Sequence, residues 1–220
     1  MIMKIMGFDF DVSIDDEKNN LLIIEDNRLF GSICFKLCLG LDEDIIFIEN
    51  DKVVKNTVTV INDIINYDLN GKAFISKLFK QVISKIVNDN GKDDQIRSEF
   101  TNIISNIYDV IDEYNVDISL NDDIDYNKFL KLIGLQFDNS YTAIIDKMLD
   151  LLEIYSEFFD ESLVFINVLC LFDDNEINEI LKYVKYKKLT VLFIENSYNR
   201  NIKFDNIYII DNDFYDYIIK

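Results

Sequence analysis

The chain of 220 residues contains no histidine, no tryptophan and no proline. Without histidine it cannot form a Ser-His-Asp or Cys-His catalytic arrangement, and it has no histidine general base. The same absence excludes zinc and iron sites that are built on imidazole ligands. Any chemistry would have to rest on carboxylates, lysine, tyrosine or a bound hard cation.

Long apolar runs are also missing. No run of the sequence approaches the length that spans a bilayer, so we predict no membrane association. The first twenty residues have no sustained apolar stretch, which argues against a secretory signal. The three cysteines are an odd number without closely paired spacing, as expected of a protein in the reducing cytoplasm. We therefore predict a cytoplasmic protein.

Positive charge is scarce. Forty-one acidic residues oppose 22 basic residues, which gives a formal net charge of −19. This average predicts repulsion of nucleic acid, but it does not exclude a local cluster of lysines, and many carboxylates can also recruit a hard cation. Hydrophobic residues make up 49% of the chain, which is enough for a core and argues against disorder.

The stretch from Leu163 to Glu195 is the basis of the fold prediction. It begins with the apolar run LVFINVLCLF, continues with an amphipathic helix that Asp173 and Glu176 can cap, and ends with LTVLFIE. Strands that are apolar on both faces and joined by a helix predict a βαβ crossover in a covered parallel sheet. The fold class is therefore α/β.

The remaining pattern predicts two domains. We expect further strands around Phe8–Val12 and at residues 19–25, 45–49, 57–61 and 206–211, and a helix over residues 26–40 that ends at Gly40. Residues 70–87, 96–111, 126–133 and 140–159 read as helices, with a break at 88–94. Residues 1–69 and 161–220 are predicted to form an α/β domain, and residues 70–160 a helical domain packed as a bundle.

The turn LNGKAF at residues 69–74 invites comparison with a phosphate-binding loop. Such a loop needs an upstream glycine, several flexible residues and then Gly-Lys-Ser/Thr. Here Gly71 and Lys72 are followed by Ala73, and no glycine lies nearby upstream. We predict a plain helix start, in a fold that can be related to phosphate-loop enzymes without their chemistry.

Two further segments have functional and structural interpretations. The loop at 116–127 carries Asp117, Asn121, Asp122 and Asp123, whose oxygens suit calcium, although a solvated acidic turn is the alternative. FIENDKVVK suggests a magnesium nuclease, but Asp51 directly precedes Lys52, so the acid-x-lysine spacing is not kept. Lys52 and Lys55 can instead form a basic patch or guard a sheet edge.

Several phrases together resemble a known family, the short-form type II-A CRISPR-associated adaptation (spacer acquisition) accessory protein, which forms rings and binds DNA ends. They are LLIIEDNRLF (21–30), DKVVKNTVTVINDIINYDLN (51–70), VDISLNDD (116–123), FLKLIGL (129–135), LTVLFIENSYNR (189–200) and IIDNDFYDYIIK (209–220). The similarity covers nearly the whole chain in the same order.

The resemblance implies a phosphate-loop-like α/β head with a degenerate nucleotide site and an inserted α-helical leg. It also implies a ring-shaped homotetramer that needs calcium, binds ends of double-stranded DNA without cutting them, and works with the CRISPR integrase complex and the RNA-guided nuclease of its locus. Carried over by position, the metal ligands are Asp117, Asn121, Asp122 and Asp123, with Ser119 and Asn121 replacing acids of relatives. The DNA-binding residues are Lys52, Lys55, Lys72 and Lys131.

On this basis we predict that the protein is not an enzyme. Two alternatives remain open at the level of the sequence. One is a divergent phosphate-loop NTPase or metal-dependent nuclease, and the other is a scaffold that binds only protein.

Overall fold

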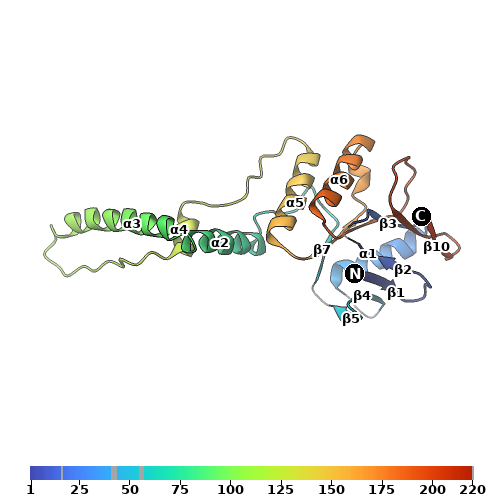
Figure 1. Cartoon of the computed structure of the whole chain (residues 1–220), viewed down its shortest axis with the longest axis horizontal. Helices are drawn as coiled ribbons and strands as arrows, with labels where there is room; N and C mark the ends of the chain where they lie inside the picture. The colour runs from blue at the N-terminus through green and yellow to red at the C-terminus, as the bar shows by residue number, and fades with distance from the viewer. Residues whose placement is uncertain (16, 41–43, 55–56, 220) are drawn as a thin grey trace. The chain divides into compact units, whose positions relative to one another are not determined.

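The computed structural model describes residues 1–15, 17–40, 44–54 and 57–219. The chain divides into two compact units. Met1–Tyr67 and Asn139–Lys220 form one, here called the head unit, and Asp68–Asp138 form the other, the helical unit. The α/β fold class is confirmed, since the head unit contains helices and two sheets (Figure 1).

The larger sheet of the head unit has six strands in the order β10-β9-β3-β8-β7-β6. Five of them run parallel, and β10 pairs antiparallel with β9. Their bounds are β3 Asn20–Ile24, β6 Val58–Ile61, β7 Ser162–Ile166, β8 Val191–Glu195, β9 Asn206–Ile210 and β10 Asp216–Ile219. Every residue of β3, β7 and β8 is buried, as their continuous apolar sequences predict.

The predicted βαβ crossover is present. The strands β7 and β8 are parallel neighbours, joined through α6 (Asp174–Lys187). The side chain of Asp173 accepts from the amide of Glu176, whose carboxylate accepts from the amide of Asp173, so the capping box forms in full. The first strand is shorter than predicted, because Asn167 turns the chain at φ 53° and the 3-10 turn η1 (Leu169–Leu171) follows.

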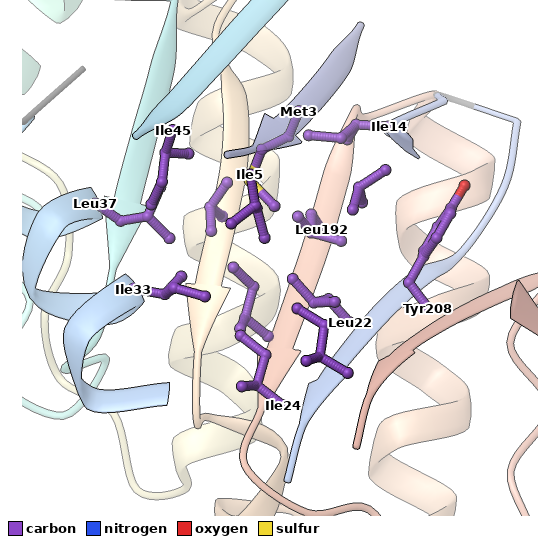
Figure 2. Packing of buried hydrophobic residues seen from close by; sticks show 14 of the residues in the cluster. Met3, Ile5, Ile14, Leu22, Ile24, Ile33, Leu37, Ile45, Leu192 and Tyr208 are labelled. Carbon is purple, nitrogen blue, oxygen red and sulfur yellow. The ribbon is translucent and has the colours of Figure 1, made fainter. Parts of the chain in front are cut away.

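A smaller antiparallel sheet covers one face of the larger one. Its order is β2-β1-β4-β5, with β1 Ile2–Ile5, β2 Asp11–Ser13, β4 Ile45–Glu49 and β5 Lys52–Val54. Together with α1 (Asn27–Leu39), which begins at its cap Asp26 and ends at Gly40, this sheet encloses the core cluster shown in Figure 2. There Met3, Ile5 and Ile45 meet Leu22 and Leu192 of the parallel strands.

Two predictions fail in this region. Phe8 and Phe10 lie in a bend between β1 and β2 instead of within a strand. The sequence predicted no strand between residues 49 and 57, but this stretch contains β5, because Asn50 and Asp51 alone make the turn before it, with φ of 50° and 60°. Positive φ at both central residues is typical of the tight hairpins that join antiparallel strands.

The helix α5 (Ile144–Phe158) belongs to the head unit, whereas the sequence placed residues 70–160 in one helical domain. It packs against α6 (Figure 1), where the carboxylate of Glu153 accepts from the hydroxyl of Tyr183 and, at 2.8 Å, from the ammonium of Lys187. The hydroxyl groups of Tyr155 and Tyr67 lie 2.8 Å apart. The boundary therefore falls near residue 138, and α5 is grouped with the head unit instead of with α2 and α3 as the sequence predicted.

The helical unit contains α2 (Lys72–Val87), α3 (Asn90–Ile111) and α4 (Tyr126–Leu132). The side chain of Asn70 joins the two ends of the unit. Its amide nitrogen donates to the backbone carbonyl of Phe137, and its oxygen accepts from the backbone amide of Phe137. The predicted break at 88–94 is only two residues long: Asn88 ends α2 and Asp89 caps α3. Within the described ranges, no helix is long and apolar enough to cross a membrane.

Candidate nucleic-acid interface

The helix α2 is unusual for so acidic a chain, because it carries four lysines and no carboxylate. The lysines are Lys72, Lys77, Lys80 and Lys85. Phe74, Leu78 and Phe79 are buried on one side of the helix. Lys72, Ser76, Lys80 and Ser84 are spaced four residues apart and exposed, so they form one stripe along the other side.

A groove of about 450 Å³ runs along this stripe. It is lined by Ser76, Lys80, Ile83, Ser84, Val87 and Asn88 of α2 and its cap and by Asn127 of α4. The side-chain amide of Asn88 donates to the hydroxyl oxygen of Ser84 at 3.1 Å. The hydroxyl hydrogen of Ser84 is therefore able to donate outward. Ammonium, hydroxyl and amide donors are the groups that contact phosphate oxygens in protein–DNA complexes.

The helix α4 adds to the positive charge of this surface. It packs against α2, and it carries Lys128 and Lys131. Lys128 lies 3.4 Å from the carboxylate of Asp125, so part of its charge is neutralised. In contrast, the part of the chain that the structure describes places no carboxylate within ion-pair distance of Lys72, Lys80, Lys85 or Lys131.

The four lysines predicted to bind DNA are therefore not equivalent. Lys72 and Lys131 share the helical unit and lie on helices that pack together. Lys52 is exposed at the start of β5, in the head unit, and Lys55 lies outside the described residues. Sequence reasoning missed Lys80 and Lys85, although the absence of acids between residues 72 and 87 was a signal that could have found them.

The head unit offers a poor site for a nucleotide. In phosphate-loop proteins the loop between a parallel strand and the next helix wraps the phosphates at the helix N-terminus. Here β3 and α1 are joined by Glu25 and Asp26 alone, and the carboxylate of Asp26 accepts from the amide of Leu29 at 2.7 Å. A carboxylate of the protein itself thus caps the N-terminus of this helix. Lys72 belongs to the other unit.

At the carboxyl end of β8, the side chain of Glu195 is 2% exposed and accepts from the amide of Leu169 at 3.0 Å. Burial raises its pKa to about 7, and the amides of Leu169 and Val168 offset this only in part. Between the ordinary carboxyl value of 4.5 and about 7, the folded state keeps a proton that the unfolded state releases. The free energy of unfolding therefore falls as pH rises through this window.

We expect Glu195→Gln to be more stable than the wild type at pH 8, by up to about 3 kcal/mol. Glutamine cannot ionise but still accepts the Leu169 amide. Below pH 4.5 the two proteins should differ little, because the wild-type side chain is then protonated in both states. Urea denaturation at both pH values measures the difference. A gap that is the same at pH 4 and pH 8 would show that ionisation of Glu195 is not its cause.

The residues predicted to bind calcium lie in the irregular segment between α3 and α4. Asp117, Asn121, Asp122 and Asp123 are all exposed, and the side-chain oxygen of Asn121 accepts from the amide of Asp123 at 3.2 Å. Their oxygen donors suit a hard cation. Over the ranges that the structure describes, however, no three acidic or cysteine side chains converge on one point. The structure thus places the four predicted ligands in one exposed loop without gathering three carboxylates at one point.

Comparisons with known proteins agree over most of the chain. The family model for the CRISPR-associated protein (Cas_Csn2) matches residues 40–214, which include the whole helical unit. The CRISPR-associated protein Csn2 of Enterococcus faecalis is 25% identical to this chain over 209 residues, which cover 92% of each protein.

Proposed function

The chain belongs to the Cas_Csn2 family of CRISPR-associated proteins, and from this premise we propose that it binds ends of double-stranded DNA during type II-A spacer acquisition. The membership confirms the family resemblance read from the sequence. The observation that carries the DNA-binding part of the proposal is the acid-free helix α2, with its groove of lysine, hydroxyl and amide groups.

The proposed binding is independent of sequence. Contacts from Lys72, Lys80 and Lys131 to phosphate oxygens fix a duplex without reading its bases. The outer carboxylates of a chain with a net charge of −19 repel polyanions elsewhere, so binding is confined to the lysine-rich surface. Lys52 and Lys55 remain proposed contacts from the head unit.

We further propose a ring-shaped homotetramer. No residue of α3 is buried, although Ile96, Phe100 and Ile103 line an apolar groove of about 200 Å³ with Ile124 and Phe129. Apolar surface of this kind supports association with another chain. Repetition of the subunit would bring the α2 lysines of several copies into one positive surface, which a single subunit cannot supply.

Calcium has a defined place in the proposal. Asp117, Asn121, Asp122 and Asp123 are exposed, so they could close on an ion or share it with carboxylates of a second copy. A divalent cation would reduce the repulsion between acidic subunits, which favours assembly. We propose that the protein performs no catalysis and passes DNA ends to the integrase complex and the RNA-guided nuclease of its locus. The divergent NTPase or metal nuclease remains the alternative.

Band shifts on linear and circular duplexes of equal length test the function. We expect the protein to shift linear DNA in calcium, to bind circular DNA at least tenfold more weakly, and to lose affinity in a chelator. The logarithm of the binding constant should fall with the logarithm of salt concentration, by about 0.9 per neutralised phosphate. Equal affinity for circular DNA would contradict end binding, and ATP turnover or nicking would favour the enzyme.

A further inference from the structure

The outermost strand of the larger sheet, β10, has free hydrogen-bonding groups. Among the described residues it pairs with β9 alone, with Tyr217 opposite Ile209 and Ile219 opposite Ile207. The amide of Asp211 donates to the carbonyl of Tyr215 at 3.0 Å, which fixes the phase of the antiparallel ladder. Because hydrogen-bonded pairs alternate, Tyr217 and Ile219 bond to β9, while the amides and carbonyls of Asp216 and Ile218 point away from the sheet.

One face of this edge strand is apolar and exposed. Tyr215, Tyr217 and Ile219 share one face of the strand and are 71%, 43% and 48% exposed. Natural sheets usually guard such an edge with lysine or proline, as β5 carries Lys52, but residues 211–219 contain neither. In the preceding turn Phe214 has a φ of 64°, a strained conformation for a bulky residue. The side chain of Asp211 stabilises this turn, because its carboxylate accepts hydrogen bonds from the backbone amides of Asp213 and Tyr215.

We propose that β10 pairs antiparallel with β10 of a second copy, about a twofold axis through Tyr217. In this register Asp216 of each copy lies opposite Ile218 of the other copy. Each of these two pairs exchanges two hydrogen bonds between backbone amide and carbonyl groups, which gives four in total. Tyr217 faces its own equivalent, and each Tyr215 faces an Ile219. The six-stranded sheets of two head units become one sheet of twelve strands.

The strand is complementary to itself in this register. All three cross-strand pairs on the exposed face join aromatic residues to aromatic or β-branched residues, and each such pair stabilises a sheet by roughly 0.2–1 kcal/mol. No aspartate faces another aspartate directly. The carboxylate of Asp216 already accepts from the amides of Asp9 and Phe10, at 3.1 and 2.8 Å. A basic extended peptide would suit the three aspartates of residues 211–216, but only a second copy explains the matched aromatic face.

The inference rests on the proposed self-association and names one of its interfaces. Its test uses the fact that only residue 217 meets its own equivalent. We expect Tyr217→Lys and Tyr217→Glu each to weaken self-association at least tenfold, because like charges then face each other across the axis. An equimolar mixture of the two variants should recover it, since lysine then faces glutamate. Sedimentation velocity over a range of protein concentrations measures both effects.

Ile219→Lys and Ile219→Glu are the matched control pair. Residue 219 faces Tyr215, so mixing these two variants should not restore association. Recovery with both pairs, or with neither, would overturn the proposed register. If the wild type associates and the Tyr217 variants associate equally well, the β10 interface is wrong and the proposed assembly stands on other surfaces. A wild type that stays monomeric at every concentration, with and without calcium, would refute both.

Discussion

Replacing Lys72, Lys80 and Lys131 together by glutamate is expected to weaken duplex binding by about a hundredfold or more. Each substitution removes a charged hydrogen bond to phosphate, which contributes about 1 kcal/mol or more, and adds a repulsive carboxylate in its place. All three side chains are exposed, so the variant should fold like the wild type. Fluorescence anisotropy with a labelled linear duplex measures the affinity, and circular dichroism checks the fold.

The head unit supplies a control of equal charge change. Lys18, Lys182 and Lys203 are exposed lysines of that unit, and reversing them lowers the net charge by the same six units. We expect this control to lose only a small part of the affinity, through long-range repulsion that salt screens. The slope of affinity against salt should fall only in the α2–α4 variant, by about one per lost contact. Equal losses in both variants would mean that overall charge, and not this groove, governs binding.

Local sequence patterns predicted the buried sheet well, for a physical reason. A strand that is covered on both faces must be apolar at every position, so β3, β7 and β8 stand out as continuous runs. The helices α1 and α6 were equally clear, because Asp26, Gly40 and the Asp173–Glu176 pair mark their ends. Short outer strands carry no such signal. The strands β5 and β10 have three and four residues and lie among charged residues, so both were missed.

The choice of partner for a helix is not a local property. The periodicity of α5 predicts a buried stripe, but it does not say whether Met148, Leu151 and Leu152 pack against α2 or α6. For the same reason the candidate site was predicted only in part. Lys72 was noticed through the Gly-Lys pair. Lys80 becomes a candidate only because it lines one groove with Ser84, Asn88 and Asn127, and the fold is needed to bring these residues together.

A cluster of aromatic side chains packed on the parallel sheet gives the largest predicted effect on stability. Phe193 lies in the middle of β8 and is fully buried. Its ring stacks on Phe165 of β7, with centroids 5.5 Å apart and planes at 17°, and it meets Phe204 edge-on at 6.0 Å. Phe204 in turn contacts Tyr198 edge-on at 5.5 Å. One side chain thus connects two central strands and the segment that leads into β9.

We expect Phe193→Ala to lower the free energy of unfolding by about 3–5 kcal/mol, because it leaves a cavity that closely packed neighbours cannot fill. Domains of this size are stable by only about 5–15 kcal/mol, so the variant should have a much lower urea midpoint. Phe193→Leu keeps more of the volume and should lose less than Phe193→Ala. Tyr186→Ala removes a ring that is 79% exposed and should change stability by less than about 0.5 kcal/mol. If Phe193→Ala were no worse than Tyr186→Ala, β8 could not be the central strand on which the parallel sheet is built.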